Sequence, residues 1–333
     1  MLIIFDDIIK NLQSSGGISV YWDNLKNNLD RKITSISYNG SNNLSDSKLN
    51  LFLQRYANFH IQTKSKYIFH SSYYRVSKSI NSKNIVTVHD FVYEYFSSGL
   101  KKWVHILQKR NAIKNAHRII CVSEHTKQDL LKFYPQIDKS IIKVIYHGVS
   151  NDFYQIKPHS FTHKNKIIFV GKRSGYKNFK ILIDSFPNLI EYELILVGGG
   201  KLSKDEIESL NKINFVHHLS ISNSELNELY NKSFVLIYPS LYEGFGLPIL
   251  ESLKAGCPVI CNNSSSTAEI GSQYVLKGVM SVDFIIKSIC KLENHNFRQE
   301  MILKGIAYAS TFTWAKTAKE TTKLYQEVWQ EFQ

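Results

Sequence analysis

The most informative stretch of the chain is Ser240-Leu-Tyr-Glu-Gly-Phe-Gly-Leu-Pro-Ile-Leu-Glu-Ser-Leu253. It follows an apolar run typical of a buried strand, and its second half has the composition of a helix. Gly244 and Gly246 let the backbone between the two elements approach a ligand where side chains would block it. Amides at a helix start attract anions, and Glu243 and Glu251, eight positions apart, can accept hydrogen bonds from sugar hydroxyls. The stretch therefore predicts a strand–turn–helix unit that binds a phosphate-linked sugar.

Short apolar runs alternate with amphipathic stretches along the whole chain, which is the pattern of parallel strands connected by helices. The predicted fold class is α/β. The expected strands are 2–5, 67–70, 85–89, 119–122 and 144–146 in a first series, then 166–170, 193–197, 234–238 and 258–261. The expected helices are 19–29, 124–133 with Ser123 as its cap, 177–186, 224–232 and 247–255.

The length of 333 residues suits two domains of ordinary size. Between residues 150 and 165 the chain turns polar and carries Pro158, and a second series of strands then begins. We therefore expect a first domain over 1–155 and a second from 156 onward. Residues 39–50, rich in serine and asparagine, predict a polar loop.

The composition limits the classes of protein to which the chain can belong. Its 43% hydrophobic and 21% charged residues are typical of a folded globular chain. No apolar run approaches the ~20 residues that span a bilayer, and the apolar start runs into Asp6 and Asp7, so we expect a cytoplasmic protein. The net charge of +13 favours anionic partners, among them diphosphates and the inner face of an anionic membrane. The charge alone would also suit nucleic acid, but no nucleic-acid-binding module is present, so none is expected as a partner.

The stretch 240–253, followed by Ala255-Gly-Cys-Pro-Val-Ile260, resembles the E-x7-E motif of the retaining family-four glycosyltransferases. The resemblance implies the GT-B fold, in which two Rossmann-like parallel-sheet domains face each other across a cleft. It also implies that Glu243 contacts the donor hexose and that Glu251 holds the ribose hydroxyls of the nucleotide. The donor-binding residues implied for the turn between them are Gly244, Phe245, Gly246 and Leu247.

Further segments match the family in order. Phe169-Val-Gly-Lys-Arg-Ser-Gly-Tyr-Lys-Asn-Phe179 resembles the segment, beginning at Gly171, whose Arg and Lys grip the donor diphosphate. Lys177 falls on the family Lys, while Tyr176 replaces the Arg that usually precedes it. Arg173 stands three positions earlier, so we expect Arg173 and Lys177 to stabilise the departing diphosphate.

Other segments resemble the nucleotide and sugar contacts. Val197-Gly-Gly-Gly200, with Gly198, resembles the family's glycine turn beside the nucleotide, and His217 lies in a segment that resembles the one lining the base. Gly16 and Gly17 match the Gly-Gly loop near the donor phosphate. Val86-Thr-Val-His-Asp90 resembles the strand that ends in a His contacting the donor sugar, which falls on His89.

Acceptor contacts are expected from residues that follow strands of the first domain. Tyr73, Tyr74 and Arg75 could stack on sugar rings and bind an acceptor diphosphate, and Asp90 could orient His89 or bind the acceptor. Phe312-Thr-Trp314 resembles the family's segment before a terminal helix that crosses back to the first domain. The first domain is then completed by 317–333, and the second ends at 316.

No metal or other cofactor is expected. The sequence contains no D-x-D triplet, the carboxylate pattern with which glycosyltransferases of the other fold hold a divalent ion on the diphosphate. The cysteines, expected to be reduced structural thiols because they lack metal-site spacing, are Cys121, Cys257, Cys261 and Cys290.

The resemblance implies a metal-independent, retaining hexosyltransferase of bacterial surface-polysaccharide biosynthesis. The donor is a nucleotide-sugar, with GDP-mannose the named candidate, and the acceptor is a glycan or a polyprenyl-diphosphate-linked chain. The catalytic residues implied are His89, Arg173, Lys177 and Glu243. Two alternatives stay open: a nucleotide-sugar epimerase of the same fold, and a catalytically inactive glycan-binding partner subunit.

Overall fold

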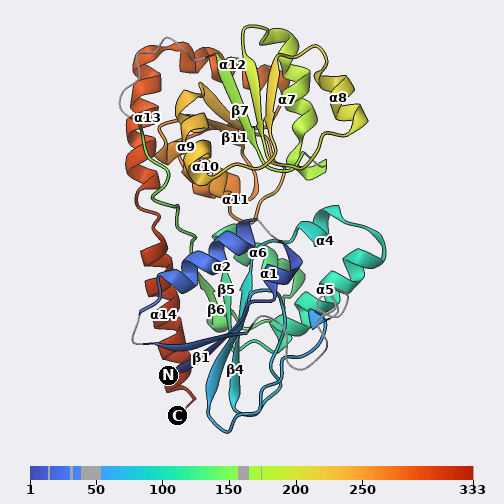
Figure 1. Cartoon of the computed structure of the whole chain (residues 1–333), viewed down its shortest axis with the longest axis vertical. Helices are drawn as coiled ribbons and strands as arrows, with labels where there is room; N and C mark the ends of the chain where they lie inside the picture. Colours follow the sequence, from blue (N-terminus) through green and yellow to red (C-terminus); the bar gives the residue numbers. More distant parts are fainter. Residues whose placement is uncertain (14–15, 31–32, 39–53, 157–164, 174, 333) are drawn as a thin grey trace. The chain divides into compact units, whose positions relative to one another are not determined.

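The computed structural model describes residues 1–13, 16–30, 33–38, 54–156, 165–173 and 175–332, except the side chain of Lys101. The chain forms two compact units (Figure 1). The first comprises Met1–Gly148 and Trp314–Gln333, and the second comprises Val149–Thr313. The sequence placed this boundary at 155, inside the polar stretch 150–165, whereas the second unit already begins at Val149.

The first unit is built on a six-stranded parallel sheet with the strand order β2-β1-β3-β4-β5-β6. Its strands are β1 (Leu2–Asp6), β2 (Thr34–Tyr38), β3 (Tyr67–Ser71), β4 (Ser82–Val88), β5 (Arg118–Cys121) and β6 (Ile142–Val144). Its helices are α1 (Ile9–Leu12), α2 (Gly17–Asn27), α4 (Val92–Phe96), α5 (Gly99–Lys114), α6 (Glu124–Phe133) and α14 (Trp314–Gln330), with a 3-10 turn at Lys139–Ile141. Every residue of β3 is buried, as expected for a central strand of a parallel sheet covered on both faces.

The second unit repeats the architecture, with the strand order β12-β11-β10-β7-β8-β9, again parallel throughout. Its strands are β7 (Lys166–Val170), β8 (Glu193–Val197), β9 (Phe215–His218), β10 (Val235–Tyr238), β11 (Val259–Asn262) and β12 (Leu276–Gly278). Its helices are α7 (Phe179–Ser185), α8 (Lys204–Leu210), α9 (Asn223–Lys232), α10 (Leu247–Lys254), α11 (Ser265–Gly271), α12 (Val282–Glu293) and α13 (His295–Ala309), with 3-10 turns at Gly175–Lys177 and Phe186–Asn188. Helix α10 packs on α13 at Gly305, where an added Cβ would lie 2.9 Å from Leu253.

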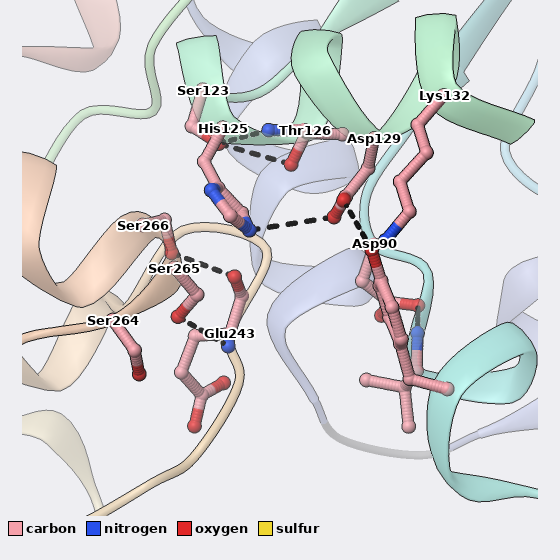
Figure 2. A network of polar contacts seen from close by, with 12 residues as sticks. Asp90, Ser123, His125, Thr126, Asp129, Lys132, Glu243, Ser264, Ser265 and Ser266 are labelled. Carbon is pink, nitrogen blue, oxygen red and sulfur yellow. Dashed lines mark hydrogen bonds and ion pairs between the residues drawn. The ribbon is translucent and has the colours of Figure 1, made fainter.

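The two parallel sheets confirm the predicted α/β class. Strand β6 ends at Val144, whereas the sequence placed a strand over 144–146. Ser123 caps α6 as predicted, since its Oγ accepts a hydrogen bond of 3.0 Å from the Thr126 amide (Figure 2). The predicted loop 39–50 and Pro158 lie outside the described residues.

The C-terminal helix belongs to the first unit, as predicted. Helix α14 packs against α2 and β3 (Figure 1). The Tyr325 hydroxyl lies 2.6 Å from Nδ1 of His70 on β3, and Thr317 Oγ1 donates to the Tyr146 carbonyl at 2.7 Å. Tyr325 is fully buried. The last part of the chain therefore supplies core side chains to the first unit.

Candidate functional site

Glu243 and Lys177 come together in the second unit. Glu243 lies in the turn from β10 to α10, and its Oε1 contacts Lys177 Nζ in an ion pair whose side chains are only 13% and 12% exposed. The Glu243 amide donates to Ser265 Oγ at 3.0 Å, and Ser266 Oγ donates to the Glu243 carbonyl at 2.8 Å (Figure 2). These bonds fix the turn, so the carboxylate has a defined position beside a cation.

Helix α10 begins immediately after this turn. Gly246 precedes its first residue with φ +99°, a left-handed conformation that glycine adopts without strain. The first turn of the helix contains no acidic residue, and the nearby Glu243 carboxylate in the preceding turn is paired with Lys177. The helix start itself is present where the sequence predicted one, and its binding of phosphate stays a prediction.

Glu251 projects from the second turn of α10. The Tyr230 hydroxyl donates to its Oε2 at 3.3 Å. Burial raises the pKa of Glu251 to about 7, and the Tyr230 hydrogen bond opposes that rise. The carboxyl therefore sits near the balance between its two protonation states at neutral pH.

The glycine turn after β8 wraps around the guanidinium of Arg173. Gly198, Gly199 and Gly200 have φ values of +76°, +77° and +75°. Their carbonyls accept from Arg173 at 2.9, 3.3 and 3.0 Å, and Lys201 contributes a further carbonyl at 3.2 Å. His217 also contacts the Gly198 carbonyl, with Nε2 at 2.9 Å. An added Cβ at Gly199 would lie 2.3 Å from Arg173 Nη1, so only glycine fits there.

This geometry corrects the role expected for Arg173. Its Nε donates to Glu206 Oε1 at 2.8 Å, and its side chain is 3% exposed. The guanidinium donors are thus engaged by a carboxylate and by backbone carbonyls inside one unit, which leaves Arg173 a structural support of the glycine turn rather than a free phosphate ligand. Glu206 was not predicted as a partner of Arg173 from the sequence, although Ser203 and Glu206 have the spacing of a capping box and form one.

In the first unit, Gly16 and Gly17 open helix α2. Gly16 has φ +152° and precedes the first helical residue, and the first turn of the helix carries no acidic side chain. Both glycines are exposed. The predicted anion-binding helix start is therefore accessible within the first unit.

His89 follows β4 directly and lies in an aromatic cluster. Its ring centroid is 5.1 Å from that of Tyr21 and 5.9 Å from that of His147, which in turn stacks on Tyr21 at 4.8 Å. Burial, with a smaller contribution from the charge of Lys109, lowers the pKa of His89 to about 3. His89 is therefore a neutral imidazole at physiological pH, able to donate from one nitrogen and accept at the other.

Asp90 continues the same loop and is positioned by two contacts. Its Oδ1 accepts from the Val92 amide at 3.1 Å, and its carbonyl accepts from Lys109 Nζ at 2.8 Å. Lys109 is fully buried and pairs with Glu94 at 2.8 Å. A buried ion pair therefore holds the loop that carries His89 and Asp90.

The three residues expected to contact the acceptor differ in their surroundings. Tyr73 is half-buried and accepts from Arg55 Nη2 at 2.7 Å. Tyr74 is 7% exposed, and both Tyr74 and Arg75 line a cavity of about 260 Å³. Arg75 is not the free cation expected, because Nη1 is 3.0 Å from Asp6 Oδ1 and Nε donates to the Ala57 carbonyl at 3.2 Å. Its charge is already compensated by a buried carboxylate.

A His–Asp pair on α6 was not predicted from the sequence. His125 Nε2 lies 3.4 Å from Asp129 Oδ2, and the Tyr95 hydroxyl donates to Asp129 Oδ1 at 2.7 Å (Figure 2). Helical spacing of four could have flagged the pair, but nothing in the sequence linked it to a ligand. Within the described ranges, no group of three or more His, Cys, Asp or Glu residues is placed to hold a metal ion.

Two parallel six-stranded sheets, with glycine turns and helix starts where strands end, form the GT-B fold, which the chain shares with solved glycosyltransferase structures. The profile described as Glycosyltransferase Family 4 matches residues 31–153, and that described as Glycosyl transferases group 1 matches residues 151–303. The chain belongs to the family-four type of glycosyltransferases and has a role in glycosyl transfer.

Three comparisons illustrate the relationship. The chain is 24% identical over 284 residues to O-antigen chain mannosyltransferase B of Escherichia coli, covering 78% of this chain and 74% of that protein. It is 31% identical over 211 residues to O-antigen chain mannosyltransferase RfbU of Salmonella typhimurium, covering 57% of this chain and 56% of that protein. Its fold matches that of Anabaena HepE in complex with UDP and glucose, with a TM-score of 0.73, 15% identity, and coverage of 97% and 98%.

Several curated relatives are matched over less than two thirds of their length. In the part of the chain that the structure describes, we find no helix with the length and apolarity needed to cross a bilayer.

Proposed function

We propose that the chain is a metal-independent, retaining hexosyltransferase that moves a sugar from a nucleotide-sugar to a glycan or lipid-linked acceptor in bacterial polysaccharide biosynthesis. The observation that carries the proposal is the Lys177–Glu243 pair at the start of α10, with Glu251 on the same helix. A cation, free helix amides and two carboxylates form a set that suits a diphosphate and its two flanking sugars.

The residues have distinct roles in this proposal. Lys177 and the amides at the start of α10 stabilise the negative charge that grows on the diphosphate as the sugar leaves. Glu243 accepts hydrogen bonds from the transferred hexose, and Glu251 accepts them from the ribose. Neutral His89 contacts a hydroxyl of the donor sugar. Arg173 acts indirectly, by holding the glycine turn.

Retention of configuration is supported by the bases that the chain offers. An inverting enzyme needs a general base with a pKa near the working pH to take the acceptor proton. The pKa of His89 is about 3, and Glu243 is paired with Lys177. Glu251 has a pKa of about 7, but it is buried against Tyr230 and assigned to the ribose. A same-face route, in which the acceptor attacks the anomeric carbon from the side that the diphosphate leaves, fits these residues better. A diphosphate oxygen then takes the acceptor proton.

GDP-mannose is the proposed donor. Two relatives carry mannosyltransferase names, whereas the similar Anabaena structure holds UDP and glucose. A thermal-shift screen of the purified chain against GDP-mannose, UDP-glucose and related nucleotide-sugars tests this assignment. A true donor at 100 times its dissociation constant adds ~2.7 kcal/mol of stability. The absence of a shift with any nucleotide-sugar contradicts the proposed function.

Proton NMR of the new linkage tests the stereochemistry, and inversion at the anomeric carbon would refute the same-face route. Transfer that survives EDTA is expected. Complete loss in EDTA, restored by magnesium or manganese, would contradict the metal-independent mechanism.

Two alternatives predict different products. A nucleotide-sugar epimerase would convert the free donor into its epimer without an acceptor, which NMR of the donor pool detects. A catalytically inactive glycan-binding subunit would bind glycans yet neither transfer nor hydrolyse any donor.

A further inference from the structure

Helix α5 presents an exposed apolar stripe. Leu100, Trp103 and Leu107 are 79%, 63% and 59% exposed, although their side chains are among the most apolar in the chain. A helix places residues three, four and seven positions apart on one face, so the stripe covers the first two turns of α5. The same face continues into Arg110 and Lys114, which are also exposed.

The opposite face of α5 is fixed to the first unit. His105, Ala112 and Ile113 are buried there. Fully buried Lys109 pairs with Glu94 at 2.8 Å and lies 4.4 Å from the centroid of the Phe91 ring. The orientation of the helix is therefore determined by its inner face, and the outer stripe is not needed for packing within the described part of the unit.

The charge of α5 has one sign. Over Gly99–Lys114 the sequence contains Lys101, Lys102, Lys109, Arg110 and Lys114 but no Asp or Glu. The whole chain carries a net charge of +13. An exposed stripe of Leu and Trp that continues into exposed Arg110 and Lys114 is typical of helices that lie in the headgroup region of a bilayer, where tryptophan rings and lysine stems bridge apolar and polar layers.

We propose that the outer face of α5 docks on an anionic phospholipid bilayer, with Leu100, Trp103 and Leu107 at the boundary between headgroups and acyl chains and with Arg110 and Lys114 on lipid phosphates. The stripe spans ~10 Å along the helix axis, far less than a stable protein interface needs. A second copy of the chain would bring two basic faces together, which like-charge repulsion opposes. A fluid anionic surface accommodates both the small apolar stripe and its basic extension.

Flotation of the full chain with vesicles tests the docking surface. We expect binding to phosphatidylcholine vesicles that contain about one third phosphatidylglycerol, weaker binding as salt rises, and little binding to pure phosphatidylcholine. The triple variant Leu100→Ser, Trp103→Ser, Leu107→Ser should reduce the partition coefficient at least tenfold, on the order expected from removing several buried apolar groups.

The second unit offers a matched control. Ile190, Val279 and Leu303 are 84%, 84% and 65% exposed but lie outside α5. The variant Ile190→Ser, Val279→Ser, Leu303→Ser also removes three exposed apolar side chains and should bind vesicles like the unchanged chain. The double variant Arg110→Gln, Lys114→Gln should weaken binding to the anionic vesicles only.

A second measurement covers the case in which the triple variant fails to fold. Lipids brominated near the headgroup should quench the fluorescence of the unchanged chain on binding, and Trp103→Phe should remove that quenching while leaving partitioning nearly intact. Equal binding by the triple variant, no vesicle binding at all, or quenching unchanged by Trp103→Phe overturns the proposal. Loss of a dimer in the triple variant, seen by light scattering without vesicles, would assign the face to a second copy instead. Donor-induced thermal shifts measured without vesicles test the proposed transferase function separately.

Discussion

At the residue scale, Arg173 and Lys177 illustrate how two cations in one loop differ in role. Arg173→Gln should lower the free energy of unfolding by roughly 1–3 kcal/mol, because it leaves the carbonyls of the glycine turn and the Glu206 carboxylate without their donor. Lys177→Ala should instead reduce turnover roughly 100-fold, as expected when a charge partner of the transition state is removed. Urea unfolding and initial rates, measured on both variants, separate the two roles. The reverse pattern would restore Arg173 as the phosphate ligand.

The raised pKa of Glu251 predicts that nucleotide binding is coupled to the release of a proton. In the free protein burial raises the pKa of Glu251 to about 7, so a fraction of the carboxyls is protonated near neutrality. Ribose hydroxyls that donate to the carboxylate favour the ionised form and lower that pKa. Binding should therefore release a proton near pH 7 and should strengthen as pH rises from 6 to 8. Calorimetry in two buffers with different ionisation enthalpies measures the release, and Glu251→Gln should abolish it.

At the element scale, the glycine turn offers a matched pair of substitutions. Gly199 and Gly200 have nearly the same positive φ, so alanine at either position incurs the same backbone strain of ~1–2 kcal/mol. A Cβ at Gly200 meets nothing within 4 Å, whereas one at Gly199 would lie 2.3 Å from Arg173 Nη1 and 2.7 Å from the Gly171 carbonyl. Gly199→Ala should therefore destabilise the protein clearly more than Gly200→Ala in urea unfolding. Equal effects would mean that the turn can move away from Arg173.

The sequence predicted the strands better than it predicted which groups the charged side chains contact. The apolar runs at 2–5, 67–70, 166–170 and 193–197 lie within strands, because strands buried on both faces leave a nearly continuous apolar signal. The role of Arg173 could not be predicted, since its carbonyl partners depend on how three left-handed glycines fold around it. Arg75 was misjudged for a similar reason. Its partner Asp6 is distant in sequence, and only the pairing of β1 with β3 brings the two strand ends together.

At the scale of the whole molecule, buried histidines predict acid sensitivity in the first unit. Burial lowers the pKa of His70, His89 and His105 to about 3 each, below the value of about 6.5 expected in the unfolded chain. Between these values the unfolded state binds more protons, so stability should fall as pH drops below 6.5. Buried Asp6, with its pKa raised to about 6, works in the opposite direction, but it is a single group.

Denaturant unfolding at pH 7.5 and pH 5 measures this trend. His70→Gln should reduce the slope of the unfolding free energy against pH by at most ~1.4 kcal/mol per pH unit, which is the contribution of one proton. Stability that stays constant over this range would mean that the imidazoles remain accessible to protons in the folded unit.

The return of α14 to the first unit fixes an order of events during synthesis. On the ribosome, residues 149–313 emerge as one continuous piece and can fold as soon as they are made. All six strands of the first unit are made before the second unit, but the first unit must wait for Trp314 and Tyr325. Until then, its helix α2 and strand β3 lack their α14 partner. A chain stopped after Thr313 should therefore keep a nucleotide-binding second unit attached to a protease-sensitive first one. Limited proteolysis with mass spectrometry would locate the cuts, and a first unit as resistant as that of the full chain would show that α14 is dispensable. A nascent chain of this protein thus carries a sheet that is made early but lacks one of its covering helices until α14 has been synthesised.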